Sequence, residues 1–108
     1  MQLQFNVVSC AGSPVGTLHI CAISSGRLFH AVRKPDGSSS PFEDVAAAVT
    51  AGNPGSPTPA DVASVGCAVV NGQLNLVSVD SAGMLWHVIR RANGAWQSFV
   101  TMTGSAAG

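Results

Sequence analysis

One block of sequence occurs twice in this chain, and this repeat limits the folds that the chain can adopt. Leu28 to Arg33 reads Leu-Phe-His-Ala-Val-Arg, and Leu85 to Arg90 reads Leu-Trp-His-Val-Ile-Arg. The two blocks lie 57 residues apart. The same spacing pairs further positions on both sides: Val8 with Val65, Cys10 with Cys67, Gly26 with Gly83, Asp36-Gly37 with Asn93-Gly94, and Phe42 with Phe99. A repeat of this length predicts two copies of one structural unit.

Each copy contains four short runs rich in Val, Ile, Leu and aromatic residues, separated by Gly, Asn, Asp and Ser. Such runs are typical of antiparallel strands joined by hairpins, and pairs such as Asn71-Gly72 favour tight turns. We therefore expect an all-β fold with two four-stranded antiparallel units, over residues 1–45 and 61–102. The expected strands are Phe5 to Ala11, Leu18 to Ser24, Arg27 to Lys34 and Pro41 to Val45, then Val62 to Val69, Leu74 to Asp80, Met84 to Arg91 and Trp96 to Met102.

Residues 46–60 join the two copies. Three prolines and two glycines lie between Thr50 and Pro59, and they disfavour a helix or a strand. The run from Ala46 to Val49 has room for one helical turn, which the following residues do not extend. We expect an exposed connection here, and a frayed tail at residues 103–108, which are small and polar.

The composition indicates that the sheets pack on both faces. Hydrophobic residues make up 46% of the chain and charged residues only 9%. A single four-stranded sheet cannot bury two apolar faces, whereas radially stacked copies can. We therefore expect two blades of a β-propeller, with the ring completed by homo-oligomerisation. A trimer with six blades is favoured, and a tetramer is the alternative.

The charged residues, the apolar stretches and the first residues of the chain indicate which partners and which cell compartment to expect. Five Lys and Arg balance five Asp and Glu, so we expect neither a nucleic-acid partner nor binding to an anionic membrane. The apolar stretches fall short of the roughly 18 residues of a membrane span. Met1 to Asn6 lacks the basic and apolar regions of a secretory signal. We expect a cytoplasmic protein or one exported by a non-classical route.

The three cysteines, Cys10, Cys21 and Cys67, are an odd number and form a poor disulfide framework. We interpret them as small, buried apolar residues. Zinc sites normally use closely spaced pairs of Cys or His, which the sequence lacks. We therefore expect no bound metal and no cofactor.

The repeated pattern resembles a known family of lectin repeats. Both copies read Gly-x-Leu, then Phe or Trp, then His-x, then Val or Ile, then Arg, followed by Asp or Asn with Gly and later by Phe. An Asn-Gly-Gln-Leu turn and an Ala-Gly-Asn-Pro-Gly connection precede the second copy of the pattern. The pattern resembles the repeat of bacterial PLL-type and tectonin-like β-propeller lectins. The chain is shorter than their usual members, and two-blade lectins that trimerise are the nearer parallel.

The resemblance implies carbohydrate binding in clefts between blades or at their rim, often of fucose-type or O-methylated sugars. Sugar sites combine an apolar platform with a few fixed polar groups, and the aromatic, imidazole and guanidinium side chains of the repeat have this chemistry. Along a regular strand Trp86 and His87 point to opposite faces, whereas Trp86 and Arg90 share one. The candidate ligand-binding residues are Trp86, Arg90, Trp96, His87, Phe29, Arg33 and His30. Their other interpretation is packing and strand pairing.

No catalytic motif accompanies these residues, and we expect no enzymatic activity. The stretch from Asp80 to Trp86 resembles the Asp-box turn of sialidase-like propellers with one residue too many, and such a turn is structural. Glycoside hydrolysis normally requires two carboxylates across a cleft, and the sequence offers no evident pair. The alternative to a lectin is a non-enzymatic β-propeller scaffold for protein–protein interaction.

Overall fold

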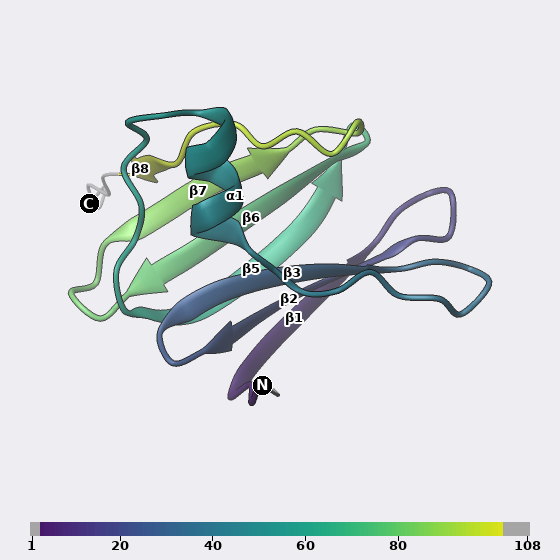
Figure 1. The fold of residues 1–108 in the computed structure, drawn as a ribbon, viewed down its shortest axis with the longest axis horizontal. Helices are drawn as coiled ribbons and strands as arrows, with labels where there is room; N and C mark the ends of the chain where they lie inside the picture. Colours follow the sequence, from purple (N-terminus) through teal and green to yellow (C-terminus); the bar gives the residue numbers. More distant parts are fainter. Residues whose placement is uncertain (1–2, 103–108) are drawn as a thin grey trace, which may run out of the picture.

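The computed structural model describes residues 3–102, so the tail expected at 103–108 lies outside the described range. The chain forms two four-stranded antiparallel sheets, each with its strands in chain order (Figure 1). The strands are β1 (Val7–Gly12), β2 (Leu18–Ser24), β3 (Arg27–Arg33) and β4 (Glu43–Asp44) in the first sheet, and β5 (Val62–Val70), β6 (Gln73–Asp80), β7 (Leu85–Arg90) and β8 (Val100–Met102) in the second. The prediction of two four-stranded antiparallel units is confirmed.

The repeat extends to the hydrogen bonds of the turns that follow β3 and β7. The amide of Lys34 donates to the carbonyl of Ser38 at 2.8 Å, and the amide of Arg91 donates to the carbonyl of Ala95 at 2.7 Å. Gly94 lies in this turn with a φ of 91°, a left-handed conformation that glycine adopts without steric strain. The two copies therefore share turn geometry as well as sequence.

Each sheet has one face that carries a histidine and one that carries an arginine, because successive residues of a strand point to opposite sides. The cross-strand pairs assign the residues to these faces. The histidine face comprises His19, Cys21, Ile23, Leu28 and His30 in the first sheet, and Asn75, Val77, Val79, Leu85 and His87 in the second. The arginine face comprises Leu18, Ile20, Ala22, Phe29 and Arg33 in the first, and Leu74, Leu76, Ser78, Trp86, Val88 and Arg90 in the second.

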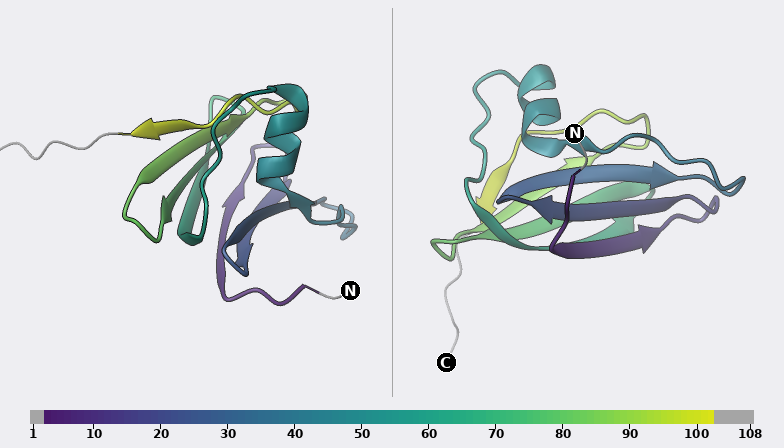
Figure 2. Two further views of the ribbon diagram at one scale, coloured as in Figure 1. Left: turned by 60° about the vertical axis from the view of Figure 1, so that its left-hand side comes forward. Right: turned by 60° about the horizontal axis from the view of Figure 1, so that its bottom comes forward.

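The core of the molecule lies between the histidine face of the first sheet and the arginine face of the second. Buried residues from both faces meet there, including Ile23 and Leu28 from the first sheet and Leu76 and Val88 from the second. Strand β5 packs against β1 and β2, and the sheets diverge from this edge (Figure 2). The two sheets are therefore stacked in the same sense, and within residues 3–102 no second sheet covers the other face of either, which we call its uncovered face.

The connection between the sheets contains a helix that extends beyond the single turn expected from Ala46 to Val49, while most residues of 46–60 are exposed. Helix α1 (Val45–Gly52) begins after Asp44, whose side chain accepts a hydrogen bond from the amide of Ala47 at 3.2 Å. Val45 and Val49 lie one turn apart and are both fully buried. Burial of this apolar pair against the core offsets the short length of the helix. Within residues 3–102 no helix is long and apolar enough to cross a membrane.

The rest of the connection is tied to the second sheet by two side chains. Asn53 donates from its amide nitrogen to the carbonyl of Trp96 at 2.8 Å. The hydroxyl of Ser56 accepts from the amide of Phe99 at 3.1 Å. Because α1 also contacts β3 and β4, it bridges the two sheets on the side where they diverge (Figure 1).

The cysteines differ in their surroundings. Cys21 is fully buried, as predicted, and Cys67 is half-buried. Cys10 is exposed, so the prediction of a buried apolar residue is wrong there. Cys10 pairs with Ile20 and lies on the uncovered arginine face of the first sheet, whereas its counterpart Cys67 points into the core.

Candidate functional site

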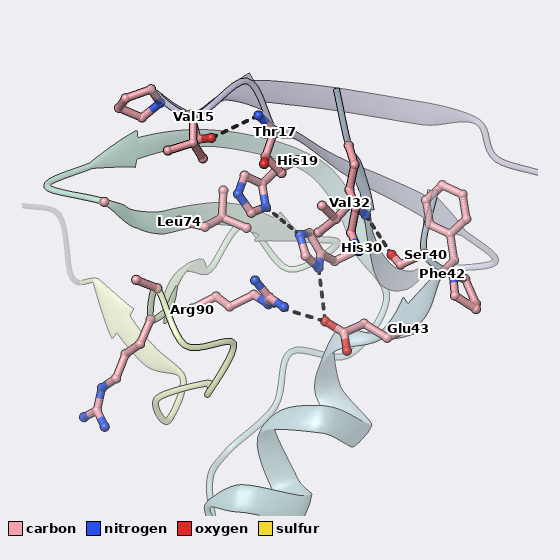
Figure 3. Close-up of a pocket in the computed structure, with 17 residues that line it drawn as sticks. Val15, Thr17, His19, His30, Val32, Ser40, Phe42, Glu43, Leu74 and Arg90 are labelled. Carbon is pink, nitrogen blue, oxygen red and sulfur yellow. Dashed lines mark hydrogen bonds and ion pairs between the residues drawn. The ribbon is translucent and has the colours of Figure 1, made fainter. Parts of the chain in front are cut away.

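A cleft of about 800 Å³ lies between the two sheets (Figure 3). Both sheets contribute to its lining. The first sheet supplies His19, His30 and Glu43 from β2, β3 and β4. The second supplies Leu74 and Arg90 from β6 and β7. The cleft therefore depends on the stacking of the two copies, and neither copy forms it alone.

Strand register places two imidazoles and a carboxylate in sequence across the floor of the cleft. His30 pairs with Glu43 across β3 and β4, and His19 lies diagonally from His30 on the same face. Nδ1 of His19 lies 3.0 Å from Nε2 of His30, and Nδ1 of His30 lies 3.1 Å from Oε1 of Glu43. The two imidazole rings lie edge to edge, with centroids 5.3 Å apart and their planes inclined by 19°. We call His19 and His30 the histidine pair.

Burial keeps the histidine pair neutral at physiological pH. It lowers the pKa of His30 to about 4, against the opposing effect of the hydrogen bond to Glu43. The pKa of His19 is also lowered, first by burial and then by the positive charge of Arg90. Both rings therefore carry a single N–H each, which defines one donor and one acceptor nitrogen per ring.

The carboxylate of Glu43 determines which nitrogen donates. An ionised carboxylate only accepts hydrogen bonds, so Nδ1 of His30 donates to Glu43. The Nε2 of His30 is then an acceptor, and it receives the Nδ1 proton of His19. This leaves Nε2 of His19 as an acceptor at the wall of the cleft.

Glu43 is held by groups from both copies. Its Oε1 also accepts from Nε1 of Trp96 at 3.2 Å and lies 3.9 Å from Nε of Arg90. Trp96 is buried and meets the ring of His30 edge-on, with centroids 5.6 Å apart. The Nε of Arg90 is buried and has no hydrogen-bond partner among residues 3–102. This nitrogen faces Glu43, while the Arg90 side chain lines the cleft.

The upper wall of the cleft is apolar and its rim is basic. Pro14, Val15, Pro41 and Phe42 form the apolar part. Phe42 is 37% exposed, and its ring packs against that of Phe5, with centroids 4.6 Å apart. The side chains at the rim include Lys34 and Arg91, both exposed. The cleft thus combines an apolar surface with donors and an acceptor.

Three of the predicted site residues come together here. His30 and Arg90 line the cleft, and Trp96 lies beneath it as the partner of Glu43. His30 belongs to the first copy, whereas Arg90 and Trp96 belong to the second. The histidines of the two repeated blocks are each hydrogen-bonded to the preceding strand: His30 to His19, and His87 to Asn75.

The other four predicted residues lie outside the cleft. Trp86 is half-buried in the core, and its Nε1 donates to Asp80 at 3.0 Å. Nε2 of His87 lies 2.9 Å from Oδ1 of Asn75, on the uncovered histidine face of the second sheet. Phe29 and Arg33 belong to the uncovered arginine face of the first sheet. Trp86 and His87 do point to opposite faces, as predicted.

Sequence reasoning missed His19, Glu43 and Phe42. The position of His19 could have been predicted from the sequence. The turn at Ser25-Gly26 sets the register of the β2–β3 hairpin, and that register places His19 and His30 on one face. Glu43 and Phe42 lie in the strand expected from Pro41 to Val45, but the loop before it left its register with β3 undetermined, and the register decides that Glu43 faces His30.

No family model, curated protein or solved structure matches the chain. Among residues 3–102, no group of three or more His, Cys, Asp or Glu side chains could hold a metal ion. What the cleft binds must therefore be inferred from its own side chains.

The lowered pKa of His30 predicts a loss of stability in acid. The unfolded chain binds a proton at His30 below a pH of about 6.5, whereas the folded protein resists it down to about 4. The free energy of unfolding should therefore fall by on the order of 3 kcal/mol as the pH drops through this interval. Urea unfolding at a series of pH values measures it.

The variant His30→Gln lacks this titration and is the control. It should be less stable at neutral pH and should lose less stability in acid than the wild-type protein, with a remainder from His19. Equal pH dependence in the two proteins would show that His30 is not held neutral by its surroundings.

Proposed function

We propose that this protein is a carbohydrate-binding protein and that the cleft between the two sheets is its sugar site. The observation that carries the proposal is the pairing of two polar groups with fixed roles. Nε2 of His19 accepts hydrogen bonds, while the guanidinium of Arg90 donates them. Neighbouring hydroxyls of a sugar both donate and accept, and so match such a pair.

The apolar wall supports the same proposal. The C–H faces of a sugar ring pack against aromatic and apolar side chains, and such sites are lined mainly by apolar groups with a few placed polar ones. Phe42 presents an exposed aromatic ring next to Pro41, and Val15 adds apolar surface at the other end of the cleft (Figure 3). The resemblance of the repeat to bacterial β-propeller lectins points in the same direction, including toward fucose-type or O-methylated sugars.

The lining favours binding over hydrolysis of a sugar. Glycosidases of the usual kind place two carboxylates on opposite sides of the scissile bond. Glu43 is the one acidic side chain among the lining residues of the cleft, and His30, Trp96 and Arg90 all engage its Oε1. A carboxylate held in this way orients the histidine pair. We infer that the protein has no catalytic role.

We also infer that the two sheets are blades of a propeller whose ring is completed by further copies of the chain. The two uncovered faces are complementary to each other. The histidine face of the second sheet and the arginine face of the first are the same two kinds of face that pack together inside the chain. Val77 and Val70 are exposed on the former, and Val8 is 67% exposed on the latter.

A second copy can cover these faces by repeating the packing found inside one chain. Such a contact joins different surfaces on the two partners, so it closes only as a ring. The divergence of the sheets from the β1 and β5 edge gives the wedge shape that a ring needs. Because each chain supplies two sheets, three chains would form six blades and four chains eight. We favour the trimer.

Binding to a glycan array, followed by calorimetry with the best-bound glycan, tests the sugar site. His19→Ala and Arg90→Gln should each weaken binding by about tenfold or more, because each removes a hydrogen bond made at a partly buried site. Arg33→Gln is the matched control, since Arg33 occupies the position of Arg90 in the first copy but lies outside the cleft. It should change the affinity far less.

An array without any bound glycan would contradict the proposal. So would an Arg33→Gln variant that loses as much affinity as Arg90→Gln.

Light scattering on the purified protein tests the ring. We expect a trimer at micromolar concentration, and we expect Val77→Glu to dissociate it, because the substitution places a charge in the apolar contact. Val15→Glu introduces the same charge at an exposed site in the lining of the cleft, away from the proposed contact, and should leave the trimer intact. A wild-type monomer would contradict the ring, whereas a tetramer would change only the number of chains.

A further inference from the structure

We propose that Cys21 and Cys67 form an oxidation site, in which a peroxide converts their two thiols into a disulfide that joins the two sheets. The proposal concerns a covalent modification of the core and does not depend on what the cleft binds.

The two cysteines lie on the two sheet faces that pack against each other in the core. Cys21 lies in the middle of β2 on the histidine face and is fully buried. Cys67 lies in β5, which packs directly against β1 and β2, and its side chain points into the same core. Ser9 links them: it pairs with Cys21 across β1 and β2, and its hydroxyl oxygen lies 3.7 Å from the sulfur of Cys67.

The thiols also interact with each other. The neighbouring Cys21 thiol is the main reason why the pKa of Cys67 falls to about 7, with a further contribution from the Ser9 hydroxyl. The neighbouring Cys67, together with burial, raises the pKa of the Cys21 thiol. Cys67 is therefore the thiol of this pair that ionises first. A thiolate beside a second thiol is the usual arrangement of an oxidisable pair.

The chemistry needs one oxidant, and hydrogen peroxide is small enough to reach a half-buried sulfur. The Cys67 thiolate attacks one peroxide oxygen, the O–O bond breaks, and protonation gives a sulfenic acid and water. The Cys21 sulfur then attacks the Cys67 sulfur, the S–O bond breaks, and the hydroxyl leaves with the Cys21 proton as a second water. Two thiols and one peroxide thus give one disulfide and two waters.

The disulfide would join the two sheets that form the cleft. Cys21 pairs with His30 across β2 and β3, so the bond would lie at the base of the histidine pair. It would also fix the separation of the two sheets at the edge where they meet. Cys21 and Cys67 are 46 residues apart, and closing so long a loop restricts the unfolded chain and stabilises the folded one.

Cys10 offers an internal control. It lies one residue after Ser9, points to the opposite side of β1 and is exposed. In the variant Cys10→Ala only the proposed pair remains. Oxidation of this variant therefore reports on Cys21 and Cys67 alone.

The experiment uses the full chain with Cys10→Ala, treated with hydrogen peroxide, quenched with catalase, denatured and alkylated. Before oxidation, mass spectrometry should find two alkylated cysteines. Afterwards it should find none, with a mass lower by two hydrogen atoms and both alkylation sites restored by dithiothreitol. The melting temperature of the oxidised protein should rise by roughly 10 °C, because a long loop has been closed. The further substitution Cys67→Ala should abolish this rise.

Three outcomes would overturn the proposal. The first is that both thiols remain alkylatable after peroxide treatment that oxidises Cys10 in the wild-type protein. The second is that Cys67 gains oxygen atoms without forming a bond to Cys21. The third is a disulfide between two chains. The wild-type and Cys10→Ala measurements suffice for each outcome, even if Cys67→Ala does not fold.

Discussion

The packing of the histidine face of the first sheet against the arginine face of the second is the interaction on which the rest of this structure depends. It buries side chains such as Ile23, Leu76 and Val88, which give the chain its core. It also brings His30 and Arg90, residues of different copies, into one cleft. Because the two copies are stacked in the same sense, the same packing leaves one face of each kind uncovered. The proposed ring forms because these two uncovered faces can pack together between neighbouring chains.

The repeat supplies the scaffold of the site, and departures from the repeat supply its chemistry. The counterpart of Glu43 is Val100, so a carboxylate faces a strand histidine only in the first copy. His19 corresponds to Asn75, which also bonds the histidine of its own copy but does not extend the pair with a second imidazole. Trp96 corresponds to Ser39, and its indole reaches Glu43 across the interface. A cleft formed between two chains would therefore lack these groups.

The local sequence pattern was sufficient to predict the strands. It was not sufficient to predict the parts of the structure that depend on the stacking of the two sheets. The bounds of β2 match the expectation because apolar runs and turn residues determine them locally. Helix α1 was missed because its stability comes from burying Val45 and Val49 in the opening between the sheets, which no local pattern reveals. Alternation along β7 separated Trp86 from His87 correctly. It could not indicate that the face with Trp86 would be covered and the face with His87 left open.

The proposed sugar site requires one protonation state of the histidine pair, because only one arrangement leaves an acceptor at the cleft. Nitrogen-15 NMR of the imidazole rings near neutral pH measures it directly. We predict that both rings are neutral and carry their proton on Nδ1, with Nε2 of His30 accepting from His19. A proton on Nε2 of His19, or a charged ring in either residue, would contradict the account.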